Sequence, residues 1–225
     1  MSDISRRLLM GAGLAAPVLA AGAAAAAPRP ETLLELAGAK LEPSRLSEAA
    51  LVIIDAQNEY RHGPLALSGI EPAIRRLAVL LKRARAAGTP VIHIAQIGDT
   101  GQMFDRKSER GQFVKEITPL PSETVIEKPL PNSFARTTLQ AHLETLKRKQ
   151  IVVAGFMTHM CVSSTVRAGF DLDYRITVAA DATATRALPS ATGGRAVAAR
   201  DIQASALAAL ADFFAAIAPV SVIPA

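Results

Sequence analysis

Three side chains in this sequence have the chemistry of a nucleophilic site: a thiol, an amine and a carboxylate. Cys161 is the only cysteine, so it cannot form an internal disulfide and is either inert core or a reactive group. Lys128 beside the thiol would favour the thiolate by charge attraction, and Asp55 could accept the thiol proton and later pass it to a leaving group. Together they predict attack on an amide, ester or imide carbonyl, followed by hydrolysis of the acyl-thioenzyme.

Cys161 lies where an apolar run gives way to a helical pattern. Residues 151–154 have the composition of a strand, Gly155 begins a turn, and 161–170 have helical spacing. This order places the thiol at or near a helix N-terminus, where backbone N–H groups and the helix dipole would stabilise a thiolate. The N–H groups of the turn at 156–161 are also placed to bind the oxyanion of a tetrahedral intermediate.

Alternating strand and helix patterns must position these residues. Apolar runs predict five strands and a sixth, edge strand, at 49–54, 91–95, 124–127, 151–154, 175–179 and 220–223. Amphipathic spacing predicts helices at 71–87, 137–149, 161–170 and 195–217. Strands that alternate with helices predict a three-layer α/β/α sandwich on a mostly parallel sheet of about six strands.

Asp55, Lys128 and Cys161 each lie at the predicted carboxyl end of a different strand. In an open parallel sheet these ends share one edge, and ligands bind in the crevice outside it. Each residue also has an ordinary structural explanation: the aspartate could cap a helix, the lysine could be solvated, and the cysteine could be buried and inert. Their convergence on one edge is the reason to predict a shared site.

The bulk composition limits the possible classes of function. The chain has 225 residues, of which about half are apolar, enough for one well-buried domain. Its formal net charge of +5 is small and scattered, aromatic residues make up 4%, and tryptophan is absent. We therefore expect no nucleic-acid partner. The predicted hydrolase chemistry leads us to expect a small-molecule substrate instead.

The N-terminal residues have the pattern of an export signal. Arg6 and Arg7 precede a weakly apolar region and an alanine tract, which is typical of a twin-arginine signal peptide spanning residues 1–27. A disordered or amphipathic cytoplasmic tail is the alternative. We predict a linker at 28–44 and a domain at 45–225, exported to the periplasm or secreted, without stable membrane association after signal cleavage.

Three motifs resemble those of the isochorismatase-like cysteine hydrolases. They are Val52-Ile53-Ile54-Asp55-x-Gln57-Asn58, Lys128 followed by Ser133 and Phe134, and Gly155-x-x-Thr158-x-x-Cys161-Val162. The resemblance covers about residues 46–214. It implies a Rossmann-like sandwich and an Asp55–Lys128–Cys161 triad with Cys161 as nucleophile. It also implies a cis peptide between Phe156 and Met157, with the N–H groups of Met157 and Cys161 as the oxyanion hole.

Departures from the resemblance narrow the chemistry. Members of the nicotinamidase type bind a metal through an Asp-x-His motif and a further histidine, but the loop at 98–121 contains Asp99 and Asp105 and no histidine. We therefore predict no catalytic metal and no cofactor. Members that act on isochorismate generally lack the nucleophilic cysteine, so Cys161 favours hydrolysis of a C–N bond or another acyl bond. The competing class is a non-catalytic ligand-binding or thiol-sensing protein on the same scaffold.

Residues near the predicted site could bind the substrate. We expect Tyr60, Phe134 and His159 to line the pocket, although the two aromatic residues could be ordinary core and His159 could be a second base. His62 and His93 are predicted to be loop and strand residues. Specificity is expected from the loops at 60–70 and 98–121, the second of which could be a lid or a pocket wall. The resemblance also favours a homo-oligomer.

Overall fold

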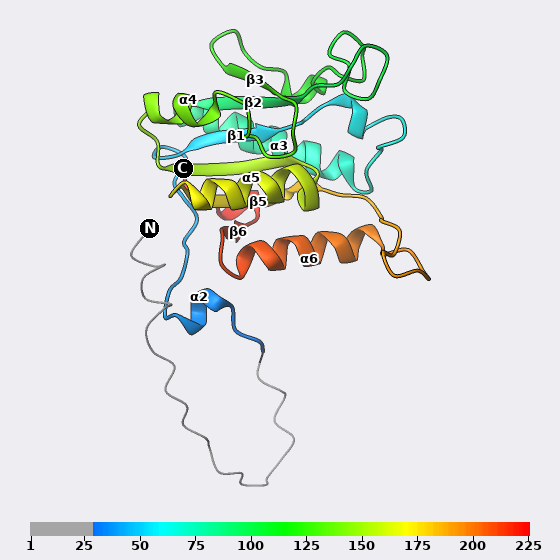
Figure 1. Ribbon diagram of the computed structural model, residues 1–225. Coiled ribbons are helices and arrows are strands. Elements are labelled where there is room, and N and C mark those ends of the chain that lie inside the picture. The colour runs from blue at the N-terminus through cyan, green and yellow to red at the C-terminus, as the bar shows by residue number, and fades with distance from the viewer. Residues whose placement is uncertain (1–28) are drawn as a thin grey trace.

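The structure is a computed structural model that describes residues 29–225 (Figure 1). The predicted signal peptide lies outside the described residues. The segment before the sheet contains one helical turn, α2 (Leu33–Leu36). A capping box begins this turn, because the Thr32 hydroxyl accepts from the Glu35 N–H while the Glu35 carboxylate accepts from the Thr32 N–H.

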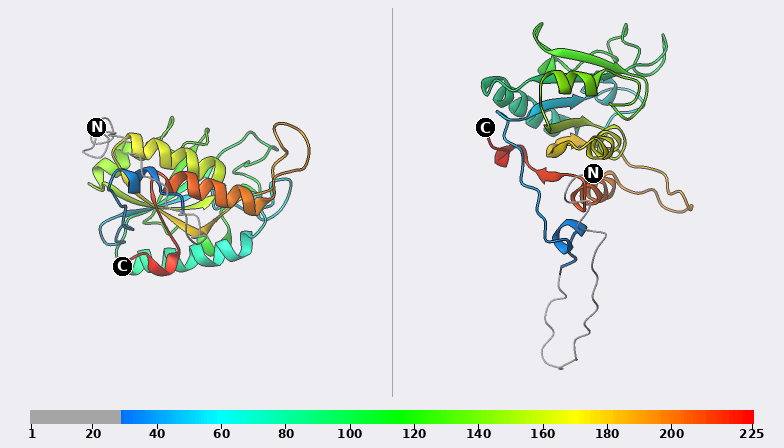
Figure 2. Two further views of the ribbon diagram at one scale, coloured as in Figure 1. Left: turned by 90° about the horizontal axis from the view of Figure 1, so that it is seen from below. Right: turned by 60° about the vertical axis from the view of Figure 1, so that its left-hand side comes forward.

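A six-stranded sheet forms the centre of the protein, in the order β3-β2-β1-β4-β5-β6, and every neighbouring pair is parallel. The strands are β1 (Ala50–Ile54), β2 (Val91–Gln96), β3 (Thr124–Lys128), β4 (Gln150–Phe156), β5 (Arg175–Ala184) and β6 (Ala216–Ala218). Helices lie on both faces of this sheet, so the predicted α/β/α sandwich is confirmed (Figure 2).

The helices divide unevenly between the two faces. One face is covered by α3 (Ile70–Ala86), and the other by α4 (Leu139–Thr145), α5 (Ser163–Asp171) and α6 (Ala199–Ala211). Residues of β1 alternate between the two cores, with Leu51 and Ile53 facing α3 and Val52 and Ile54 facing the other side. Burial on both faces explains the unbroken apolar run of this strand.

The C-terminal segment differs from the prediction. The helix expected at 195–217 is confined to α6, and β6 begins at the end of that range and pairs with 177–179 of β5. The strand expected at 220–223 is instead a 3₁₀ turn at Val220–Val222. The alanine-rich run has helical propensity, but the open edge of β5 offers unpaired backbone groups, and tertiary pairing overrides propensity there.

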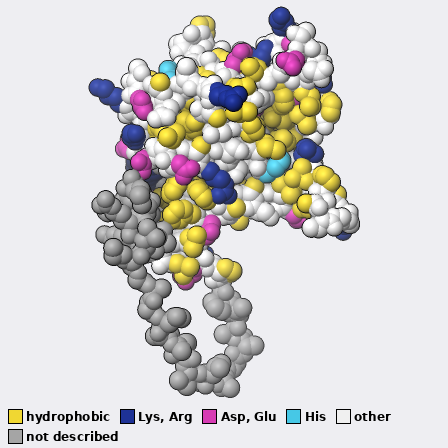
Figure 3. Space-filling view, in the orientation of Figure 1, with side chains coloured by type: hydrophobic (Ala, Val, Ile, Leu, Met, Phe, Trp, Pro, Cys, Tyr) yellow, Lys and Arg dark blue, Asp and Glu magenta, His cyan; other side chains and the backbone are white. Residues whose placement is uncertain are grey.

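The surface in Figure 3 shows no large basic patch, and the described residues contain no membrane-spanning helix. Lys and Arg side chains are scattered over the face shown in Figure 3 and do not gather in one large patch. Within residues 29–225, no helix has both the length and the apolar character needed to cross a membrane.

Candidate active site

The site lies at the carboxyl ends of four neighbouring strands. The chain passes from β1 to β2 and β3 on one side and then returns to β4 on the other, so a switch point falls between β1 and β4. Asp55 directly follows β1, Lys128 is the last residue of β3, and Cys161 lies in the turn after β4. With Gln96, the last residue of β2, they form what we call the thiol site.

The ammonium of Lys128 lies at the centre of the thiol site. Its Nζ is 2.9 Å from Asp55 Oδ2, 3.3 Å from Cys161 Sγ and 2.6 Å from Gln96 Oε1. Asp55 and Lys128 are fully buried, and Cys161 is 5% exposed. The structure therefore brings together the three residues that the sequence places at separate strand ends. Gln96 was not predicted, although it too is a polar residue directly after an apolar strand.

The carboxylate of Asp55 is buried and poorly satisfied. Burial raises its pKa, and the nearby Lys128 ammonium offsets only part of this shift. The contact between Nζ and Oδ2 is an ion pair, and in the described part of the chain neither carboxylate oxygen accepts a well-aligned hydrogen bond. A carboxylate in this state has open acceptor positions, which suits it to take up a proton.

The thiol of Cys161 does not have the lowered pKa that we expected. Burial and the Asp55 carboxylate raise the pKa of Cys161 to about 12, and Lys128 counteracts only part of this rise. Cys161 also lies in a π-helical turn, Thr158–Val162, before α5 begins at Ser163. The resting thiol is therefore protonated and needs a base.

The turn between β4 and Cys161 brings the backbone close to β1. A Cβ added at Gly155 would lie 2.0 Å from the carbonyl oxygen of Ile54, so only glycine fits there. The peptide bond between Phe156 and Met157 is cis, as the resemblance implies. Among residues 29–225, the Met157 N–H has no protein acceptor, which leaves it free for a ligand.

Side chains from β5 and α6 brace this turn. The hydroxyl of the buried Thr158 lies 3.0 Å from the carbonyl oxygen of Ala184 and 2.7 Å from Gln203 Oε1. Gln203 Nε2 donates in turn to the Thr183 hydroxyl at 2.9 Å. Thr158 belongs to a motif noted in the sequence, but nothing in the local pattern identified Gln203, which lies 45 residues further along the chain.

Tyr60 lies beside the thiol site. It is 2% exposed, and its ring meets those of Phe104 and Phe156 edge-on, with centroids 5.4 and 5.9 Å away. Burial raises the pKa of Tyr60 strongly, and the nearby Asp55 and Cys161 add to this rise. Tyr60 thus connects the site to the loop at 98–121.

Phe134 packs beside α5. Its ring stacks on Tyr174 with centroids 5.6 Å apart and sits against Gly169 of α5. Gly169 follows Cys161 by two helical turns, which is about 12 Å along a helix axis. Core packing accounts for these contacts of Phe134, and its role in substrate binding stays a prediction.

His159 lies at the rim of the site and is half-buried. Its Nδ1 is hydrogen-bonded to the hydroxyl of Thr185. Burial lowers the pKa of His159, and the charge of Arg186 lowers it further, so the ring is neutral at pH 7. Thr185 and Gln203 line a cavity of about 320 Å³ beside the start of α6.

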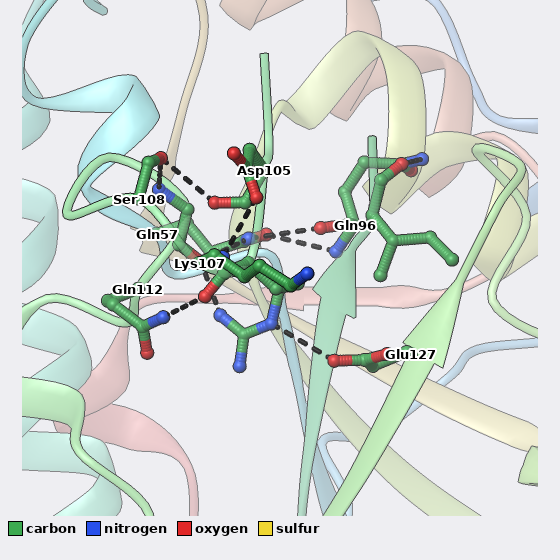
Figure 4. Close-up of polar contacts among 10 residues, drawn as sticks. Gln57, Gln96, Asp105, Lys107, Ser108, Gln112 and Glu127 are labelled. Atoms are coloured by element: carbon green, nitrogen blue, oxygen red, sulfur yellow. Dashed lines mark hydrogen bonds and ion pairs between the residues drawn. The ribbon is translucent and has the colours of Figure 1, made fainter. Parts of the chain in front are cut away.

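The loop at 98–121 is fixed to the segment after β1. The fully buried Glu59 accepts from the Phe104 N–H and the Arg110 guanidinium, both at 3.1 Å. Gln57 Nε2 donates to the carbonyl oxygen of Gly111 at 2.8 Å (Figure 4). Phe104 is thereby held against Tyr60, so this loop forms a wall beside the site.

The remaining histidines and acidic residues have other positions. His93 is buried in β2 with its Nε2 2.9 Å from Glu123 Oε2, and His62 is exposed in a loop, so both predictions are confirmed. Within residues 29–225, no three or more His, Cys, Asp or Glu side chains are grouped closely enough to hold a metal ion.

Comparisons with known proteins agree with the fold. The Isochorismatase domain family matches residues 49–220. The secreted isochorismatase effector Isc1 of Verticillium dahliae is 38% identical over 168 residues, which cover 74% of this chain and 85% of that protein. The ureidoacrylate amidohydrolase RutB of Stutzerimonas stutzeri is 31% identical over 175 residues, which cover 62% of this chain and 71% of that protein. The crystal structure of an isochorismatase from Pseudomonas putida has a TM-score of 0.82 at 43% identity and covers 86% of this chain and 98% of that one. This protein therefore belongs to the isochorismatase family of hydrolases.

Proposed function

We propose that this protein is a cysteine hydrolase that cleaves a small amide, imide or related acyl substrate through a thioester on Cys161. The observation that carries the proposal is the buried Lys128 ammonium, which contacts both the thiol sulfur and the Asp55 carboxylate. Similarity to an amidohydrolase supports a C–N bond as the bond that is cleaved. We expect this substrate to be a small molecule, because the site lies at a buried sheet edge.

The reaction begins with proton transfer from Cys161 Sγ to Asp55. The sulfur then bonds to the carbonyl carbon of the substrate, and the N–H groups of Met157 and Cys161 stabilise the resulting oxyanion. When the intermediate collapses, the C–N bond breaks and the departing nitrogen takes the proton from Asp55. Water then attacks the thioester carbonyl and gives a proton to Asp55. The C–S bond breaks, the leaving sulfur takes this proton from Asp55, and the acid product leaves as the thiol is restored.

Lys128 compensates charge at each of these steps. Its ammonium lies close enough to Sγ to stabilise the thiolate as it forms, while the ion pair with Asp55 orients the carboxylate. A redox-sensing role for Cys161 is less well supported, because sensing thiols have a low pKa and ready access to solvent. The Cys161 thiol has neither property.

Mass spectrometry of the intact protein tests this mechanism. Wild-type protein mixed with a panel of small amides, imides and esters is expected to gain the mass of an acyl group on Cys161 with at least one of them. The Cys161→Ala variant is expected to show neither the adduct nor turnover. A panel in which wild type turns over no substrate, or in which Cys161→Ala is equally active, would exclude the cysteine mechanism.

We also propose that catalysis needs no metal or other cofactor. The residues of the thiol site supply a nucleophile, a base and an oxyanion site, so no step of the scheme requires a Lewis acid. Dialysis against a chelator is expected to leave turnover unchanged. Activity that is lost on dialysis and restored by a divalent cation would contradict this proposal.

Export and self-association are proposals of the same kind. The twin-arginine pattern and the similarity to a secreted effector support export from the cytoplasm. N-terminal sequencing of protein from fractionated cells tests it, and an intact Ser2 in the cytoplasmic fraction would refute it.

A homo-oligomer is expected from the family, and light scattering during size-exclusion chromatography measures its mass. A monomer would refute it.

A further inference from the structure

We propose that Gln96 is a positioning residue that holds the Lys128 ammonium in its place between the carboxylate and the thiol. An ammonium has three N–H donors, and three acceptors surround Nζ: Asp55 Oδ2 at 2.9 Å, Gln96 Oε1 at 2.6 Å and Cys161 Sγ at 3.3 Å. Gln96 makes the shortest of these contacts. This inference rests on the proposed hydrolase mechanism, in which Lys128 serves both neighbours.

The strand register places Gln96 directly under the lysine side chain. Gln96 of β2 pairs with Lys128 of β3, and β2 lies between β3 and β1. To reach Asp55, the ammonium must therefore extend across the end of β2. The amide of Gln96 supports it there, and Gln96 Nε2 donates to the carbonyl oxygen of Ile97 at 3.2 Å, which leaves Oε1 to face the ammonium.

A second glutamine fixes the backbone of Gln96. The fully buried Gln57 accepts from the Gln96 N–H through Oε1 at 2.9 Å and donates to the Gln96 carbonyl through Nε2 at 3.0 Å (Figure 4). The same Nε2 donates to Gly111 in the loop at 98–121. Both polar groups of the Gln96 main chain are thus paired by one side chain, so Oε1 has little freedom to move.

A neutral amide suits this position better than a carboxylate. The titratable groups that face the thiol are Asp55 from β1, Lys128 from β3 and Tyr60 from the turn after β1. Gln96 accepts a hydrogen bond from the ammonium without adding a second negative charge. The positive charge of Lys128 therefore remains available to the sulfur.

The test is the pH dependence of Cys161 alkylation by iodoacetamide, which needs no substrate and reports on a single thiol. Gln96→Met, which keeps the size but removes the acceptor, is expected to slow alkylation at a fixed pH by about tenfold, because the ammonium shifts towards Asp55. Gln96→Glu is expected to slow it further and to move the profile to higher pH. The control is Gln150→Met. Gln150 is the first residue of β4, at the opposite end of that strand from the thiol site, and its side chain donates a hydrogen bond to Glu48. This variant is expected to leave the pH profile unchanged.

Thermal melting shows whether each variant is folded. If Gln96→Met does not fold, the test rests on Gln96→Glu alone, because this variant keeps both the size of the side chain and an acceptor oxygen. A folded variant with the wild-type alkylation rate and profile would overturn the role of Gln96. That result would leave the hydrolase proposal intact, because acyl-enzyme formation on Cys161 is measured separately.

Discussion

Strand β3 has a buried carboxylate network near each of its ends, and the two networks differ in how many hydrogen bonds the carboxylate accepts. At its start, Glu123 accepts from Arg85 through both oxygens at 2.7 and 2.8 Å, from His93 at 2.9 Å and from the Leu120 N–H at 2.9 Å. At its other end, Lys128 forms an ion pair with Asp55, whose oxygens accept no well-aligned hydrogen bond from residues 29–225.

The hydrogen bonds decide which of the two carboxylates has the lowered pKa. Burial opposes ionisation of Glu123, but the bonds from Arg85, the Leu120 N–H and His93 outweigh it and lower the pKa of Glu123 to about 2. Burial also opposes ionisation of Asp55, and there the pKa is raised because Lys128 compensates too little. A fully satisfied carboxylate is a structural anion, whereas an unsatisfied one can exchange protons with a neighbour.

Asp55→Asn is expected to produce the largest effect. Without the proton acceptor, turnover should fall by about 10²–10⁴-fold, the range for general base catalysis. Because the Asp55 charge raises the pKa of Cys161, alkylation of the thiol should be at least as fast as in wild type. Parallel turnover and alkylation assays measure both. A variant that keeps wild-type turnover would show that Asp55 is not the base.

Glu123→Gln tests the carboxylate network at the start of β3. It removes the anion that Arg85 and His93 share, so the free energy of unfolding should fall by about 1–3 kcal/mol, the cost of leaving buried hydrogen-bonding groups unsatisfied. Chemical denaturation measures the change. The alkylation rate of Cys161 should not change, and a large change would mean that the two networks are coupled.

The stability difference between wild type and Glu123→Gln should depend on pH. The pKa of Glu123 is about 2 in the folded protein against an ordinary value of 4.5, so its contribution is fully present above about pH 4.5 and is lost as the pH falls towards 2. Melting temperatures of the two proteins should therefore approach each other below about pH 4.5. A difference that stays constant down to pH 3 would contradict the lowered pKa.

His159→Gln should have the smallest effect. The ring is neutral and bonded to Thr185, and the proposed mechanism assigns the base to Asp55, so we expect turnover to change by less than tenfold. The pH profile of kcat/KM should keep its shape. A loss as large as that of Asp55→Asn would assign the proton transfer to histidine.

Some features of the fold and of the site could be predicted from the sequence, and others could not. The unbroken apolar run that ends at Asp55 identified β1, because burial on both faces requires such a run. The short run that ends at Lys128 identified β3 by its β-branched residues, although this edge strand is only partly buried. Phe134 shows the limit, since an aromatic residue in a motif looks the same whether it faces a pocket or packs on Tyr174. The C-terminal strand was missed because alanine-rich segments favour a helix unless an open sheet edge pairs with them.

The sequence by itself determined the alternation of strands and helices, and with it the meeting of Asp55, Lys128 and Cys161 at one edge. Hydrophobic periodicity and turn residues are local properties, so they can be read along the chain. Only the tertiary structure decided how deeply these groups are buried and that Gln96 contacts the Lys128 ammonium. Burial and the number of hydrogen-bond partners set a pKa, and both come from segments distant in sequence. For that reason the thiol, which the sequence suggested would be a ready thiolate, instead has a raised pKa beside the Asp55 carboxylate.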